Sequence, residues 1–251
     1  MHGRWMALAA AVALAACGSS SDERGGVPAR TPTPLDHTST GTIAGIVRLE
    51  GTPPPMGTLP LAGWAACAEQ HQGPVPTGDV LVHDGLVENA FVYVKEGLGN
   101  RVFAVPTAAV TIDQRGCVYH PRVVGAQVGQ PIEFVNDDAT LHNVHGTPRD
   151  SSPWNFTMPI QGSRRTLRID APEVMVSVRC DLHPWMQGWI GVLDHPYFAV
   201  TGADGRFALE DVPPGDYVVA AWHERFGVRE TRVTLPPKGT AEVTFTFTPP
   251  G

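Results

Sequence analysis

The segment from residue 174 to residue 186, with the sequence VMVSVRCDLHPWM, joins a strand pattern to a run of potential metal ligands. Its apolar residues alternate as far as Cys180, and side chains two positions apart lie on the same face of a strand. We therefore expect the even-numbered residues from 174 to 180 to face a core. Cys180, His183 and Met186 then place a thiol, an imidazole and a thioether close together at the end of that strand.

These residue types predict one copper ion. Soft sulfur combined with imidazole selects copper over hard cations, and two histidines, one cysteine and a weakly bound methionine form an arrangement typical of electron transfer. The second histidine must come from a neighbouring strand end, and His142, from an earlier segment of the chain, supplies it. The predicted ligands are therefore His142, Cys180, His183 and Met186.

The spacing of these residues resembles that of the amicyanins, a family of small cupredoxins. His142-Asn143-Val144-His145 and Cys180-x2-His183-Pro184-x-Met186-x-Gly188 carry the resemblance, which extends over 115–194. Plastocyanins and azurins have longer ligand loops. The resemblance implies a type 1 (blue) copper site in which His142, Cys180 and His183 are trigonal ligands and Met186 is axial. It also implies that Asn143 braces the two ligand loops through hydrogen bonds.

The same resemblance implies an electron port. In cupredoxins the histidine of the ligand loop lies at the surface, ringed by apolar side chains, so His183, Pro184 and Trp185 are expected there together with Met158. His145 and His142 are separated by an odd number of positions, which puts His145 on the opposite face of an extended strand. We expect His145 to be an ordinary imidazole, with a replacement ligand as the alternative.

The N-terminal segment 1–16 resembles a bacterial lipoprotein signal peptide. Arg4 precedes a short apolar run, Trp5–Ala16, which is too short to span a bilayer and ends directly before Cys17. The resemblance implies lipidation of Cys17 and an exported, periplasmic protein anchored to the membrane, with the outer membrane favoured. An ordinary secretory signal is the alternative. Residues 17–41 are rich in Gly, Ser, Thr and Pro and predict a flexible tether.

Cys67 and Cys117 remain once Cys17 and Cys180 are assigned. Two leftover cysteines in an exported protein are expected to form a disulfide. A disulfide between them would close a loop of about 50 residues, which stabilises a protein by roughly 4 kcal/mol in the chain-entropy model. The competing use is a Cys2His2 zinc site made of Cys117, His120, Cys180 and His183, which would leave Cys67 unpaired.

The rest of the chain predicts an all-β protein in three sections, 42–105, 106–194 and 195–248. The expected fold is a cupredoxin-like Greek-key β-sandwich with flanking transthyretin-like or Ig-like β-sections. Section 195–248 resembles the carboxypeptidase-regulatory β-sandwich module, because a hairpin around Asp204-Gly205 precedes Pro213-Pro214-Gly215 and a strand that begins at Tyr217. Section 42–105 begins like such a module too, and the copper section is either inserted in it or fused to it. The predicted strands are 42–49, 80–82, 90–94, 132–136, 167–169, 174–180, 190–193, 198–201, 207–209, 217–222 and 243–247.

Composition narrows the function further. The net charge of −7 and the absence of a basic run argue against binding to nucleic acid. No sequence motif of a hydrolase, metalloprotease or phosphate loop is present, so we expect no enzyme. The leading hypothesis is single-electron transfer between redox proteins, a cytochrome or a dehydrogenase. Copper delivery by an envelope lipoprotein is the alternative, and adhesion through the flanking β-sections is a third.

Overall fold

The computed structural model describes residues 31–249. The predicted signal peptide 1–16, the lipidated Cys17 and most of the expected tether lie outside these residues. The end of the tether is ordered, because Thr33 N–H donates to Val102 O and Gly41 already begins a strand. Within residues 31–249, no helix has the length and apolar character needed to cross a bilayer.

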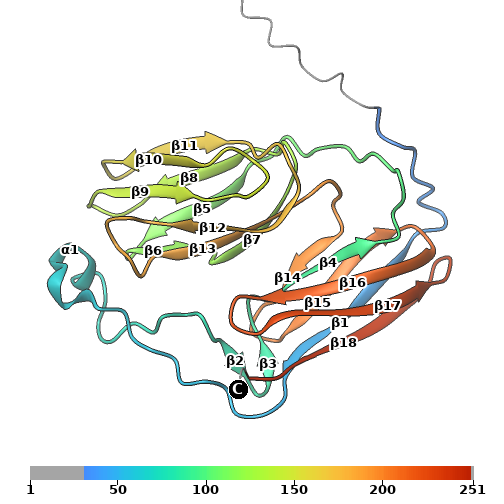
Figure 1. Ribbon diagram of the computed structural model, residues 1–251, viewed down its shortest axis with the longest axis horizontal. Helices are drawn as coiled ribbons and strands as arrows, with labels where there is room; N and C mark the ends of the chain where they lie inside the picture. The colour runs from blue at the N-terminus through green and yellow to red at the C-terminus, as the bar shows by residue number, and fades with distance from the viewer. Residues whose placement is uncertain (1–30, 250–251) are drawn as a thin grey trace, which may run out of the picture. The chain divides into compact units, whose positions relative to one another are not determined.

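Nine strands from the middle of the chain form what we call the central sandwich, drawn in green to orange in Figure 1. One sheet has the order β11-β8-β5-β6 and the other β10-β9-β12-β13-β7, so neighbours in space are often distant in sequence. The pairs β5·β8 and β7·β13 are parallel and the other pairs antiparallel. The strands are β5 (Val110–Arg115), β6 (Val118–His120), β7 (Val123–Gln127), β8 (Ile132–Asn136), β9 (His142–Gly146), β10 (Trp154–Met158), β11 (Ser163–Leu167), β12 (Glu173–Arg179) and β13 (Gln187–Leu193).

The remaining strands form the flanking sandwich, to which both ends of the described chain contribute. Its sheets have the orders β15-β1-β3-β2, with β18 also paired to β1, and β14-β4-β16-β17. Figure 1 shows β1 in blue beside β18 in dark red, and the two pair in parallel along their length. The strands are β1 (Gly41–Leu49), β2 (Val82–His83), β3 (Leu86–Val87), β4 (Phe91–Glu96), β14 (Phe198–Val200), β15 (Arg206–Val212), β16 (Gly215–His223), β17 (Gly227–Leu235) and β18 (Thr240–Phe247).

The first and third predicted sections therefore form one sandwich rather than two. β1 lies between β15 and β18, and β4 lies between β14 and β16. The buried side chains of β1 and β18, such as Ile43, Val47 and Phe247, belong to a single apolar core. The sequence left open whether the copper section is inserted in the flanking module or fused to it, and the structure shows insertion. The predicted all-β Greek-key class is confirmed.

Two local predictions were wrong. Phe198–Val200 and Arg206–Val212 do not form a hairpin, because β14 pairs with β4 while β15 pairs with β1 in the other sheet. The strand expected at 167–169 ends at Leu167 and extends backwards to Ser163 instead. Its sequence, SRRTL, is mostly exposed and has no apolar alternation that could have revealed it.

Strand β12 delivers Cys180 to the core as the alternation predicts. Val176, Val178 and Cys180 are at most 1% exposed. Val174 is only half-buried, because the register with β13 shifts between Glu173 and Val176 and turns the start of the strand. The side chains that approach the site are thus fixed by a regular strand up to Arg179, where β12 ends.

A loop from the first section also reaches the central sandwich. Residues 59–71, which we call the cap, contain the short helices η1 (Leu61–Gly63) and α1 (Ala65–Ala68). Leu59, Leu61 and Cys67 of the cap belong to the core of the central sandwich. The cap therefore packs with a sandwich whose first strand, β5, begins only at Val110.

Candidate metal centre

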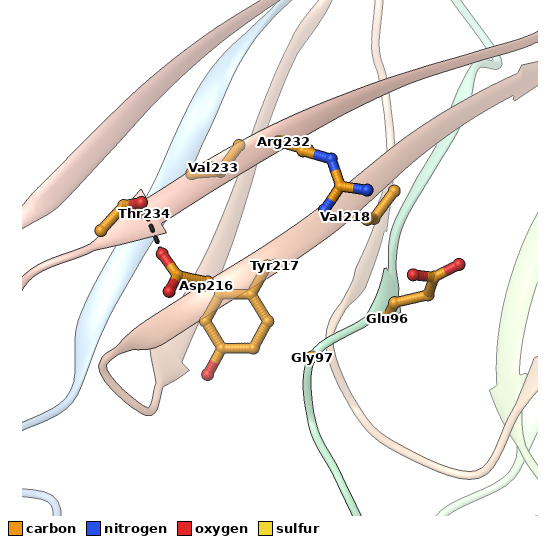
Figure 2. A pocket seen from close by; sticks show the side chains of 8 residues that line it. All are labelled: Glu96, Gly97, Asp216, Tyr217, Val218, Arg232, Val233 and Thr234. Carbon is orange, nitrogen blue, oxygen red and sulfur yellow. Dashed lines mark hydrogen bonds between the residues drawn. The ribbon is translucent and has the colours of Figure 1, made fainter.

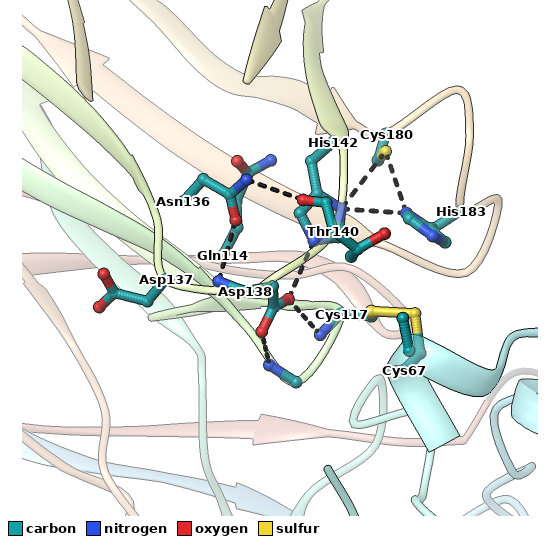
Figure 3. A network of polar contacts seen from close by, with 12 residues as sticks. Cys67, Gln114, Cys117, Asn136, Asp137, Asp138, Thr140, His142, Cys180 and His183 are labelled. Carbon is teal, nitrogen blue, oxygen red and sulfur yellow. Dashed lines mark hydrogen bonds and ion pairs between the residues drawn. A yellow bond between two sulfur atoms is a disulfide. The ribbon is translucent and has the colours of Figure 1, made fainter. Parts of the chain in front are cut away.

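Three predicted ligands converge at one end of the central sandwich. His142 begins β9, Cys180 directly follows β12, and His183 lies in the loop between β12 and β13. Nδ1 of His142 lies 3.0 Å from Nδ1 of His183, and Cys180 Sγ lies 3.9 and 3.6 Å from these nitrogens. Figure 3 shows the three side chains pointing toward one another. None is more than 2% exposed, so solvent has almost no access to the three side chains.

The loop that carries two of these ligands is closed by its own backbone. Met186 N–H donates to His183 O at 2.8 Å, and Cys180 N–H donates to Met186 O at 3.3 Å. Met186 is fully buried and belongs to the same apolar cluster as Cys180. The loop from Cys180 to Met186 is therefore a tight turn whose geometry leaves little freedom to Cys180 and His183.

The surroundings favour the thiolate form of Cys180. Burial alone would raise the pKa of this thiol, but hydrogen bonds with His142, with His183 and with the Asn143 amide lower the pKa to about 6. The Asn143 N–H lies 3.5 Å from Sγ and points to it. The thiolate is the form that ligates metals, and a thiolate with two imidazoles is a donor set that suits copper.

A buried carboxylate, Asp138, holds the first histidine from behind. Its Oδ2 lies 2.9 Å from Nε2 of His142, and neither side chain is exposed. The same carboxylate accepts hydrogen bonds from the amides of Gly116 and Cys117 at 2.7 and 2.8 Å. Figure 3 shows Asp138 between His142 and Cys117. A ligand histidine whose second nitrogen bonds a carboxylate has a fixed ring orientation and tautomer.

Charge and hydrogen bonding dominate over burial in this pair. Burial would raise the pKa of Asp138, but the hydrogen bonds from His142, Cys117 and Gly116 lower it. Burial would lower the pKa of His142, but the hydrogen bonds to Asp138 and Cys180 raise it. Asp138 could not be identified from the sequence, because an aspartate in a turn shortly before a histidine has no distinctive pattern.

Asn143 makes hydrogen bonds to two other segments beside the cluster. Its Oδ1 accepts from the Asp181 amide at 2.7 Å and lies 3.3 Å from Cys180 Sγ, while its Nδ2 donates to Asn155 Oδ1 at 2.8 Å. These contacts tie β9 to the ligand loop and to β10. His145 points to the opposite side, where its Nδ1 lies 2.9 Å from Asp181 Oδ1, and it takes no part in the ligand cluster.

The structure does not place His183 and Met158 at the surface, as the expected electron port requires. His183 is 2% exposed and Met158 is fully buried, so neither forms a surface patch. Trp64 of the cap covers His183 instead, with its ring centroid 4.8 Å from the imidazole centroid. The prediction failed because Trp64 belongs to section 42–105, which lies outside the segment that resembles the amicyanins.

The disulfide between Cys67 and Cys117 is present and decides against the zinc alternative. Cys117 is not available as a thiolate, and among residues 31–249 His120 belongs to no cluster of potential metal ligands. Cys180 is the free cysteine of the described chain.

The flanking sandwich has a surface pocket of its own. Figure 2 shows a surface pocket at the ends of β4, β16 and β17, where Asp216 accepts a hydrogen bond from Thr234 Oγ1 at 2.6 Å. It is lined by Glu96, Gly97, Asp216, Tyr217, Val218, Arg232, Val233 and Thr234, with no histidine or cysteine.

Comparisons with known proteins give one family match and several similar solved structures. Residues 192–248 match the carboxypeptidase regulatory-like domain family, in the section where the sequence predicted it. Three solved structures similar to the chain are copper proteins or cupredoxins. A Cu-containing nitrite reductase from Thermus scotoductus SA-01 is 26% identical, with 39% of this chain and 25% of that chain covered and a TM-score of 0.31. This chain thus spans a quarter of the nitrite reductase.

The other two are smaller. A purple cupredoxin from Nitrosopumilus maritimus is 21% identical over 33% of this chain and 98% of its own, with a TM-score of 0.29. A reduced amicyanin variant is 21% identical over 40% of this chain and 97% of its own, with a TM-score of 0.31. A search among curated proteins finds no similar sequence.

Proposed function

We propose that this protein carries single electrons through one type 1 copper ion. The observation that carries the proposal is the convergence of His142 Nδ1, Cys180 Sγ and His183 Nδ1 within 4.8 Å of one another, all of them buried. Two imidazoles and one thiolate form the trigonal donor set of blue-copper sites, and Met186 is the proposed axial ligand. When bound, copper supplies a one-electron couple between Cu(II) and Cu(I).

The role of the protein is to hold the donors still. Asp138 fixes the ring of His142, and the turn from Cys180 to Met186 fixes the other donors from one strand end. A ligand set that keeps its geometry in both oxidation states lowers the reorganisation that accompanies electron transfer.

Copper delivery is less well supported. Transfer of a metal ion to another protein requires ligands that solvent or a partner can reach, whereas the three donors here are at most 2% exposed. We propose first that the protein retains its metal. We propose next that it exchanges electrons with a cytochrome or a dehydrogenase, and last that it is periplasmic and attached to lipid at Cys17. The buried donors support the first of these, and the N-terminal sequence up to Cys17 supports the last.

The visible absorption spectrum of the purified protein loaded with Cu(II) tests the proposal. We expect an intense blue thiolate-to-copper band that is absent from Cys180→Ser, because the sulfur is its source. His145→Gln is the matched control, since His145 lies on the same strand as His142 but points away from the ligand cluster, and it should keep the band. A colourless wild-type protein, or a band that survives Cys180→Ser, would overturn the proposal.

A further inference from the structure

Trp64 lies between the buried ligand His183 and solvent. Its indole centroid is 4.8 Å from the His183 ring and 5.6 Å from the Trp185 ring, in edge-on contacts. Trp185 is in turn 5.3 Å from His183. Trp64 is 41% exposed while His183 is 2% exposed, so a molecule that approaches this edge of the site meets the indole first.

The position of Trp64 is fixed from several sides. Further along the cap, Cys67 is bonded to Cys117, whose amide is held by Asp138. Trp185 Nε1 donates to the Cys117 carbonyl at 2.9 Å, and His71 Nε2 lies 2.8 Å from the Gly116 carbonyl. The cap is therefore attached to the turn at residues 116–117, the same turn that holds the carboxylate behind His142.

We propose that Trp64 is the exposed end of the electron path, in the place where the sequence had put His183. This inference rests on the proposed function. With copper bound, one electron from the reduced centre of a partner protein, which is thereby oxidised, would reduce the metal. No atom is transferred, and the indole is neither oxidised nor reduced. Trp64 acts by filling the space between the partner surface and the His183 ring with an aromatic side chain in contact with both.

This role predicts opposite responses from a large and a small redox partner. In Trp64→Ala a protein cannot enter the vacated space, so its gap to His183 widens and electron exchange slows. A small complex can enter that space and approach His183 directly, so its exchange accelerates. A purely structural role of the indole would not separate the two rates.

The experiment compares wild type, Trp64→Ala and Trp64→Phe, each loaded with copper. Stopped-flow absorbance at the blue band measures exchange with cytochrome c, a basic protein that suits the net charge of −7, and with hexaammineruthenium. We expect Trp64→Ala to exchange severalfold more slowly with cytochrome c and severalfold faster with hexaammineruthenium, with Trp64→Phe between it and wild type. The reduction potential and the blue band should stay unchanged.

Met56→Ala is the matched control, because Met56 is a 37% exposed apolar residue outside the cap and should alter neither rate. Rates that stay unchanged, or that change in the same direction for both partners, would overturn the proposal. If Trp64→Ala fails to hold copper, Trp64→Phe keeps an aromatic ring and is judged by the same two rates. A wild-type protein without a blue band would contradict the proposed function instead, so the two failures are distinct.

Discussion

Buried histidines behave in opposite ways in the two sandwiches. His142 in the central sandwich and His195 and His223 in the flanking sandwich are all at most 6% exposed. Burial opposes the charged form of each, and it lowers the pKa of His195. Burial and the nearby Arg122 charge lower the pKa of His223 to about 4. In His142 the hydrogen bonds to Asp138 and Cys180 exceed the effect of burial and raise the pKa.

The difference lies in what each imidazole touches. His223 stacks on Phe226, with ring centroids 4.5 Å apart, and His195 Nε2 lies 2.9 Å from the Val94 carbonyl. These side chains fill a core and are satisfied by backbone. His142 instead contacts three other ionisable side chains, Asp138, Cys180 and His183. Such clusters mark functional sites more reliably than burial does. A buried histidine is thus informative only together with its partners.

The largest expected effect concerns the disulfide that only the central sandwich possesses. Replacing both Cys67 and Cys117 by serine should lower the free energy of unfolding by about 4 kcal/mol, because the bond closes a loop across 50 residues. Urea unfolding followed by near-ultraviolet circular dichroism measures this. Equal stability of the double variant and wild type would mean that the cap is held by its packing alone.

The next effect tests the carboxylate behind His142. Asp138→Asn should weaken metal binding about 10–100-fold, since one oxygen can no longer accept all three hydrogen bonds that the carboxylate accepts now. Chelator competition measures the affinity. Asp137→Asn, a change at the adjacent exposed aspartate, is the control and should leave the affinity unchanged. Equal losses of metal affinity in both variants would show that Asp138 has no specific role in metal binding.

The pH dependence of stability tests a buried histidine of the flanking sandwich, His223. The pKa of His223 is about 4 in the folded protein, below its ordinary value of 6.5. The unfolded chain therefore binds more protons between these pH values, so stability is retained above pH 6.5 and is lost as the pH falls toward 4. The loss from this residue should be about 2 kcal/mol between pH 7 and pH 5.

His223→Gln removes that titration and should flatten this part of the stability profile, as measured by urea unfolding at both pH values. His83→Gln, which changes a half-exposed histidine of the same sandwich, is the control and should keep the wild-type slope. An unchanged slope in His223→Gln would mean that the acid sensitivity arises elsewhere.

The smallest effect is expected at the surface pair beside the site. Hydrogen bonds from His145, Asn155 and Asn143 lower the pKa of Asp181 to about 2 despite the slight opposing effect of burial. Its side chain is 41% exposed, so solvent screens these contacts and Asp181→Asn should cost less than about 1 kcal/mol of stability. Thermal unfolding measures this, and a cost as large as that of losing the disulfide would contradict the contrast between exposed and buried pairs.

Sequence reasoning succeeded where the information is local. The alternation that ends at Cys180 and the short spacing to His183 are contained in one segment, so the strand and the proximity of these two side chains could be predicted together. The burial of His183 could not, because Trp64 belongs to another section and only the tertiary fold brings it there. β17 was missed for a different reason, since its sequence is largely polar and exposed.

The topology of the flanking sandwich has a consequence for the order in which the strands can pair as the chain emerges with its N-terminus first. β1 emerges first, yet its parallel partner β18 is Thr240–Phe247, near the end of the chain. All strands of the central sandwich emerge before β18, so that sandwich can fold while β1 still has an unpaired edge. An unpaired strand edge is a template for association between chains. We therefore expect association between copies to be favoured most before β18 has paired with β1.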